Sequence, residues 1–165
     1  MILKTERLLI RKFDSNDIDL IYEINNDKEC IEFNGWDSMS ISECEKVLNK
    51  WISNYNQNNQ YGVFCVEDIK TNESIGMAFI MKSVDLDNYE IGFRLRRFKW
   101  GLGYAKEISL GFIDYGNEIL NASKIFAEVH SVNKRSRNIF EKIGFDILEH
   151  PDGPSGILYE YKLNE

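Results

Sequence analysis

The sequence predicts one layered domain of the α/β (α+β) class over residues 1–165, with a mixed central sheet of about seven strands flanked by about four helices. Three observations predict this class. Short segments of alternating apolar and polar residues are interspersed with segments whose apolar residues have helical spacing. The hydrophobic content of 43% and the aromatic content of 13% suit a chain with a sizeable core. No internal repeat or low-complexity linker divides the sequence.

The N-terminal third contains one predicted strand and two predicted helices. Leu8 and Ile10 alternate with charged or polar neighbours, which predicts a strand over residues 5–12. Residues 14–16 offer N-cap side chains for a first helix with apolar positions at 18, 21, 22 and 24. Ser42 and Glu45 have the spacing of a capping box, and the apolar residues that follow them predict a second helix.

The rest of the chain contains the other predicted strands and helices. Residues 61–67 and 74–81 predict a hairpin around a polar turn, and residues 89–95 predict the next strand. A helix begins near Gly103 and ends at about residue 117, and a strand follows at 124–129. Asn133 is expected to cap a helix over residues 134–143 that Gly144 ends, before two last strands at 145–148 and 157–163.

Charge and cysteine content exclude several classes of protein. The net charge of −7 argues against nucleic acid as a partner, and suits either a cationic partner or plain solubility. No apolar run approaches the ~20 residues of a membrane span, and the charged N-terminus lacks a signal-peptide core. Cys30, Cys44 and Cys65 have no short spacing, so we expect no disulfide framework, no metal site and a cytoplasmic location.

A turn with two glycines, Gly101 and Gly103, lies between the strand at 89–95 and the helix that follows it. Such a turn directs backbone N–H groups and a helix N-terminus at one point, which suits a phosphate group. A dinucleotide fingerprint would need glycine or alanine where Lys106 stands, and the Gly-Lys-Ser/Thr ending of a P-loop is absent. The alternative to a phosphate site is an ordinary tight connection.

The motif at 101–105 resembles the acetyl-coenzyme-A pyrophosphate loop of the GNAT N-acetyltransferase superfamily. Trp100 before it is similar to the branch that includes the ribosomal-protein N-terminal alanine acetyltransferases. The resemblance covers nearly the whole chain, through residues 5–11, 74–76, 89–93, 133–136 and 141–145.

The resemblance implies acetyl-CoA as co-substrate and a set of residues that bind it. The backbone of residues 93–95 would pair with the pantetheine arm, and an N–H group there would polarise the thioester carbonyl. Asn133 would bond the pantetheine while capping its helix, and the basic residues at 94, 96, 97 and 99 would meet phosphates. The expected cofactor-binding residues are Phe93, Arg94, Leu95, Arg97, Trp100, Gly101, Leu102, Gly103, Tyr104, Ala105, Lys106 and Asn133.

Glu90 is the candidate general base. Strand alternation places Glu90, Gly92 and Arg94 on one face, and Gly92 leaves room beside Glu90 for a ligand or a backbone. An amine acceptor has a pKa near ~10, so it must lose a proton before it attacks a thioester. The alternative is a solvated strand carboxylate.

The candidate acid departs from the family pattern. Phe140 stands where the superfamily commonly has a tyrosine, and Ser136 lies one helical turn before it. Ser136 is therefore a candidate catalytic residue that orients a water or the thiol, or else a surface residue. His130 and His150 are isolated and are expected to be structural. Trp36 lies in a loop where this family often determines acceptor specificity, or belongs to the core.

The resulting hypothesis is an acetyl-CoA-dependent N-acetyltransferase that transfers the acetyl group directly in a ternary complex, as a monomer or homodimer. The implied acceptor is a primary amine, with a protein N-terminus, as on a ribosomal protein, foremost. One alternative acceptor is a small amine such as a polyamine, an amino acid or an aminoglycoside. The other alternative, suggested by Phe140, is a non-catalytic acyl-CoA-binding module.

Overall fold

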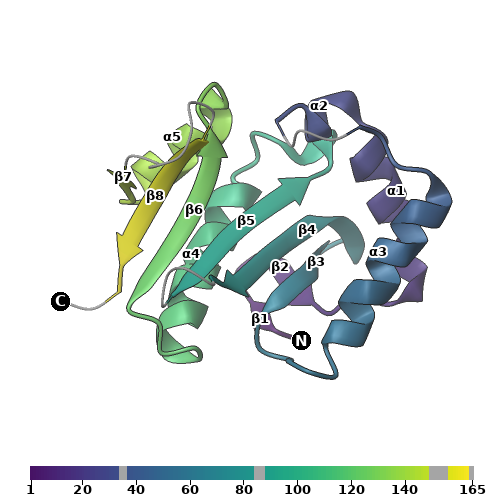
Figure 1. The fold of residues 1–165 in the computed structure, drawn as a ribbon, viewed down its shortest axis with the longest axis horizontal. Coiled ribbons are helices and arrows are strands. Elements are labelled where there is room, and N and C mark those ends of the chain that lie inside the picture. The colour runs from purple at the N-terminus through teal and green to yellow at the C-terminus, as the bar shows by residue number, and fades with distance from the viewer. Residues whose placement is uncertain (34–36, 84–87, 149–155, 164–165) are drawn as a thin grey trace.

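The computed structural model describes residues 1–33, 37–83, 88–148 and 156–163. Within these ranges eight strands form one sheet in the order β1-β2-β3-β4-β5-β6-β8-β7 (Figure 1). The mixed α/β architecture that the sequence predicts is confirmed. The strands are β1 (Leu3–Lys4), β2 (Leu8–Arg11), β3 (Gly62–Asp68), β4 (Glu73–Lys82), β5 (Tyr89–Leu95), β6 (Lys124–His130), β7 (Asp146–Leu148) and β8 (Gly156–Lys162).

The strand predicted over residues 5–12 corresponds to β2, and a short strand that was not predicted, β1, precedes it and pairs with it as a hairpin, which makes eight strands rather than seven. The turn between β1 and β2 begins at Thr5. The Thr5 amide donates to the Leu8 carbonyl (2.9 Å), and the Thr5 hydroxyl accepts from the Leu8 amide (3.1 Å). A threonine side chain that bonds the local backbone in this way stabilises a turn.

The helices are α1 (Ile18–Asn26), α2 (Lys28–Ile31), α3 (Ile41–Asn54), α4 (Tyr104–Glu118) and α5 (Lys134–Lys142). The predicted capping box of the second helix was wrong by two residues. Ser40 is the N-cap of α3, and the carboxylate of Glu43 accepts a hydrogen bond from the Ser40 amide (2.8 Å). Both pairs have the same spacing, so spacing alone does not distinguish them. No helix in the described ranges is long and apolar enough to cross a bilayer.

Helices cover both faces of the sheet. On one face, Phe140 of α5 stacks on Phe93 of β5, with ring centroids 5.9 Å apart. The next residue of the strand, Arg94, points to the other face and donates to Asn25 of α1 (2.8 Å). The core lies in these two layers, with Tyr159, Phe64 and Phe112 among the largest fully buried side chains.

The sheet opens between β5 and β6, its one parallel pair of neighbours among the described strands. Pairing there is limited to Tyr89 with Ile125 and Glu90 with Phe126. Beyond Glu90 the two strands diverge, as Figure 1 shows for the upper parts of β5 and β6. The C-terminal half of β5 therefore has no paired strand on the side of β6. The candidate site lies there.

Candidate active site

Two adjoining cavities open where β5 and β6 diverge. The larger one, about 510 Å³, runs between the end of β5, the glycine turn and the start of α5, and we call it the groove. The smaller one, about 200 Å³, is lined by residues of β4, β5 and β6, and we call it the chamber. The two cavities adjoin, because both are lined by Phe33, Phe93, Arg94, Asn133 and Ser136.

The glycine turn forms one wall of the groove. Gly101 and Gly103 have φ angles of 76° and 84°, in the left-handed region that favours glycine. Gly103 is the N-cap of α4 and makes no side-chain cap, so the first amides of the helix remain directed at the groove. The arrangement fits a phosphate or pyrophosphate group, because N–H groups and the helix dipole meet at one point.

Arg7 holds this turn from outside, a role that the sequence did not reveal. Its guanidinium donates to the Leu102 carbonyl (2.9 Å), pairs with Glu107 (2.6 Å) and lies 4.5 Å from the centre of the Tyr104 ring. The Arg7 amide also donates to Glu107 (2.8 Å). Because the Leu102 carbonyl is tied to Arg7, the peptide units of the turn have a fixed orientation.

The groove is strongly basic although the chain is acidic. Its described lining includes one carboxylate, Glu29, and five basic side chains. Arg135 lies 4.2 Å from the centre of the Trp100 ring, and Lys99 pairs with Glu73 (2.7 Å). A cavity with this excess of positive charge fits a ligand with several phosphate groups. The five are Arg94, Lys99, Lys106, Arg135 and Lys142.

Most of the expected cofactor-binding residues line the groove, but two do not. The side chain of Arg97 lies outside it and pairs with Glu29 (2.6 Å) and Asp27 (3.6 Å). Leu102 is 53% exposed and contributes its carbonyl to Arg7 rather than a side chain to the groove. The residues that line it are Phe93, Arg94, Leu95, Trp100, Gly101, Gly103, Tyr104, Ala105, Lys106 and Asn133.

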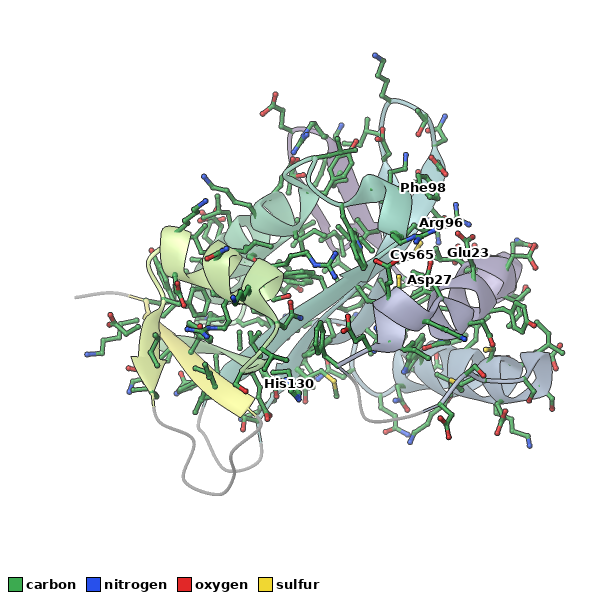
Figure 2. The ribbon with its side chains drawn as sticks, turned by 90° about the horizontal axis from the view of Figure 1, so that it is seen from above. Glu23, Asp27, Cys65, Arg96, Phe98 and His130 are labelled. Carbon is green, nitrogen blue, oxygen red and sulfur yellow. The ribbon has the colours of Figure 1, made fainter. Side chains whose placement is uncertain are left out.

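Arg96, the other cation of the basic run, belongs to an ion-pair cluster away from the groove. Its guanidinium pairs with Glu23 of α1 (2.8 Å) and Glu73 of β4 (3.1 Å), and Figure 2 shows it beside Glu23. Arg96 therefore ties α1 to the sheet instead of facing the groove.

The backbone of β5 faces the groove at alternate residues. The Arg96 amide donates to the Ile75 carbonyl of β4 (2.9 Å), so the backbone groups of Arg94 also point to β4. Those of Phe93 and Leu95 point the opposite way, toward the cleft. The Leu95 carbonyl accepts from Trp100 Nε1 (2.9 Å), which anchors the tryptophan at the mouth of the groove.

Glu90 lies at the last position where β5 and β6 pair. Its side chain is half-buried on the sheet face that also carries Glu128 and His130. Burial, and then the charge of Glu128, raise the pKa of Glu90 above its usual range. Glu90 is not among the described residues that line the groove or the chamber. The room expected beside Gly92 is filled, since a Cβ there would meet the ring of Phe79.

The start of α5 forms the opposite wall. Asn133 caps the helix, as expected, by accepting a hydrogen bond from the Ser136 amide (3.2 Å). Ser136 lines both cavities, and Phe140 lines the chamber one turn further on. Phe140 is 3% exposed and packs against Phe145 with ring centroids 5.1 Å apart.

Two chamber residues, Glu128 and His130, are not among the site residues that the sequence predicts, and His130 is expected there to be structural. Glu128 and His130 alternate on β6 and both line the chamber, together with the apolar side chains of Phe33, Val63, Met77 and Phe79. Strand alternation groups Glu128 with His130, but only the parallel register of β6 against β5 places them beside Gly92. Trp36 and His150 lie outside the described residues.

A basic groove over a helix N-terminus, adjoining a small chamber, fits an enzyme that uses a phosphate-bearing cofactor. The comparison with protein families agrees. The model described as the acetyltransferase (GNAT) domain matches residues 7–146. The chain belongs to the GNAT acetyltransferase family and is an acetyl-CoA-dependent N-acetyltransferase.

Similar proteins support the family over the full length of the chain. The uncharacterized N-acetyltransferase p20 of Bacillus licheniformis is 29% identical, covering 97% of this chain and 86% of its own. A GNAT-family acetyltransferase structure from Bacillus anthracis has a TM-score of 0.84 at 24% identity and covers 98% of each chain. The Vibrio cholerae spermidine N-acetyltransferase, solved with CoA and spermine, has a TM-score of 0.78 at 22% identity, covering 94% of this chain and 95% of its own.

Proposed function

We propose that the protein acetylates a primary amine whose adjoining part is compact and apolar, by direct transfer in a ternary complex. The observation that supports this proposal is the chamber. It adjoins the groove at Phe93, holds about 200 Å³, and combines apolar side chains with the polar groups of Glu128 and His130. Acetyl-CoA in the groove would therefore present its thioester to an amine in the chamber. A protein N-terminus with a small first side chain belongs to this acceptor class.

The charge of the chamber favours a monoamine over a polyamine. A polycation is best held by several carboxylates, as electrostatic complementarity requires. The described lining of the chamber offers Glu128 as a carboxylate and the guanidinium of Arg94 against it. The related Vibrio cholerae enzyme was solved with spermine, so a polyamine is the second candidate acceptor.

The positions of the residues support the following proposed roles. The amides at the start of α4 and the basic side chains of the groove would hold the phosphates, and Asn133 would bond the pantetheine. The backbone of Phe93 and Leu95 points into the cleft, where an N–H group would polarise the thioester carbonyl. Glu90 would take the proton that the arriving ammonium group gives up. Since Glu90 does not line the chamber, this proton would reach it through water or through Glu128. Ser136 would orient the thiol or a water.

The acceptor class is tested by thiol release from acetyl-CoA with four amines. We expect alaninamide and a short peptide beginning with alanine to be acetylated with a higher kcat/KM than spermidine or lysine. The reason is that the first two place one charge and a small apolar group in the chamber. The products are identified by mass spectrometry. A higher kcat/KM for spermidine would contradict the monoamine proposal, and no turnover with any of the four would contradict the acceptor class.

Glu90→Gln tests the base. Glu90 accepts a proton only when it is ionised, so the rate should rise with pH through its raised pKa. We expect the glutamine variant to lose about 10²-fold in kcat at neutral pH and to lose this rise, because the amide accepts no proton. The measurement is kcat against pH with alaninamide.

Glu128→Gln is the companion variant. The charge of Glu128 raises the pKa of Glu90. In the Glu128→Gln variant this charge is absent, so the rise of kcat with pH should occur at lower pH than in the wild type. If kcat rises with pH over the same range in both variants as in the wild type, Glu90 is not the base.

A further inference from the structure

His130 is the last residue of β6, and its side chain faces the chamber. Its ring lies beside that of Phe33, with centroids 5.4 Å apart. Its Nδ1 atom is buried and has no hydrogen-bond partner among the described residues. Buried polar nitrogens are nearly always hydrogen-bonded, so an unpartnered Nδ1 on a residue that lines a cavity points to a partner that arrives with a ligand. Figure 2 shows His130 between the part of the molecule with β8 and α5 and the part with α1 and α3.

The backbone ties His130 to the groups that meet the donor. The Asn133 amide donates to the His130 carbonyl (2.8 Å), which closes the turn from β6 into α5. Asn133 and Ser136 line both the groove and the chamber, and Phe140 is another of the residues that line the chamber. His130 therefore shares one small cavity with Phe140, whose ring has no proton to give to a departing thiolate.

We propose that His130 is a catalytic residue that takes a proton from the attacking amine and returns it to the departing thiolate. The inference rests on the acetyl transfer proposed above. As the amine nitrogen bonds to the acetyl carbon, its N–H bond breaks and the proton goes to Nδ1. The C–S bond then breaks, its electron pair stays on sulfur, and the imidazolium gives the proton to that sulfur. The sum is amine plus acetyl-CoA giving amide plus CoA, with His130 neutral again.

Imidazole suits both halves of this transfer, because histidine gains and loses a proton near neutral pH more readily than other side chains. The charged groups around it come from three elements. Glu128 of β6 and Arg94 of β5 line the same chamber, and Arg137 of α5 donates to the Ser131 carbonyl (3.1 Å). Glu90 keeps a separate role, since an ammonium acceptor has one more proton to lose before it attacks.

His130→Asn and His130→Ala test the proposal with alaninamide as acceptor. An asparagine places a hydrogen-bonding group near the position of Nδ1 but cannot carry a proton. We expect both variants to lose about 10²-fold or more in kcat, the size of a general acid–base contribution, with an unchanged Kd for CoA. Added imidazole should restore part of the activity of the alanine variant and none of that of asparagine. An asparagine variant with wild-type kcat would reduce His130 to a positioning residue and overturn the proposal.

A spectroscopic measurement tests whether His130 Nδ1 contacts the thiol of CoA, with no acceptor amine present. Nitrogen NMR of histidine-labelled protein reports the state of Nδ1, and the His130→Asn variant assigns the signal. We expect CoA to shift the Nδ1 resonance and desulfo-CoA, which lacks the thiol, to leave it in place. Equal spectra with the two ligands would overturn the proposal. If wild-type protein fails to acetylate alaninamide while CoA alone shifts the resonance, the acceptor class is wrong and the thiol contact stands.

Discussion

Gly103→Val is expected to abolish acetyl-CoA binding. Gly103 has a φ of 84°, and a β-branched residue forced into this region costs about 1–3 kcal/mol. The turn avoids the strain by rotating its peptide units, which turns the first amides of α4 away from the groove. A Cβ at Gly103 would also lie 3.4 Å from the Arg7 guanidinium, so the valine side chain would press on the residue that ties down the Leu102 carbonyl. At about 1.4 kcal/mol for each tenfold change, we expect a loss of at least ~100-fold in affinity.

Leu102→Val is the matched control for this variant. It places the same residue one position earlier, in a side chain that is 53% exposed and outside the groove. We expect it to bind acetyl-CoA like the wild type. Isothermal titration calorimetry measures both affinities, and a thermal melt shows that both variants are folded. A Gly103→Val protein that binds acetyl-CoA normally would mean that the pyrophosphate lies elsewhere.

The glycine turn was predictable because its determinants are local. Two glycines between a strand and a helix require a left-handed backbone, and both have it. Asn133 was identified for the same reason, since an N-cap depends on the residues next to it. The elements from residue 61 to residue 145 also follow local patterns, and the structure confirms them within a few residues.

The role of Arg7 could not be predicted, because it depends on contacts between distant segments. Its partners Leu102 and Glu107 lie about a hundred residues away in the sequence. The basic run before the turn shows the opposite error. A cluster of positive charge indicated phosphate contacts, but Arg96 and Arg97 are paired with carboxylates of α1, α2 and β4. Charge in a sequence does not show which cations are already neutralised.

The chamber required the register of the sheet. Alternation along β6 puts Glu128 and His130 on one face, but alternation alone does not show which residues of β5 share that face. Because Glu90 pairs with Phe126, Glu128 and His130 lie on the same face of the sheet as Gly92 and Arg94. His130 was therefore interpreted as structural from the sequence, and its unpartnered nitrogen became visible only in the structure.

Phe140→Ala is expected to lower the free energy of unfolding by about 3–5 kcal/mol, as for other buried phenylalanines. Phe140 is 3% exposed, and its ring lies 5.9 Å from Phe93, 5.1 Å from Phe145 and 5.8 Å from Tyr159. Truncation removes the centre of this aromatic cluster and leaves a cavity joined to the chamber. Urea denaturation followed by circular dichroism measures the loss.

Phe140→Tyr distinguishes packing from chemistry at this position. The ring lines the chamber as well as the core, so a hydroxyl added at its tip should enter the chamber. We expect the tyrosine variant to keep the free energy of unfolding within about 1.5 kcal/mol of the wild type, because the ring still fills its site. A loss as large as that of alanine would mean that the ring tip faces the core. Combined with His130→Asn, the phenol should recover part of the lost kcat, because it supplies the thiolate with the proton that asparagine withholds.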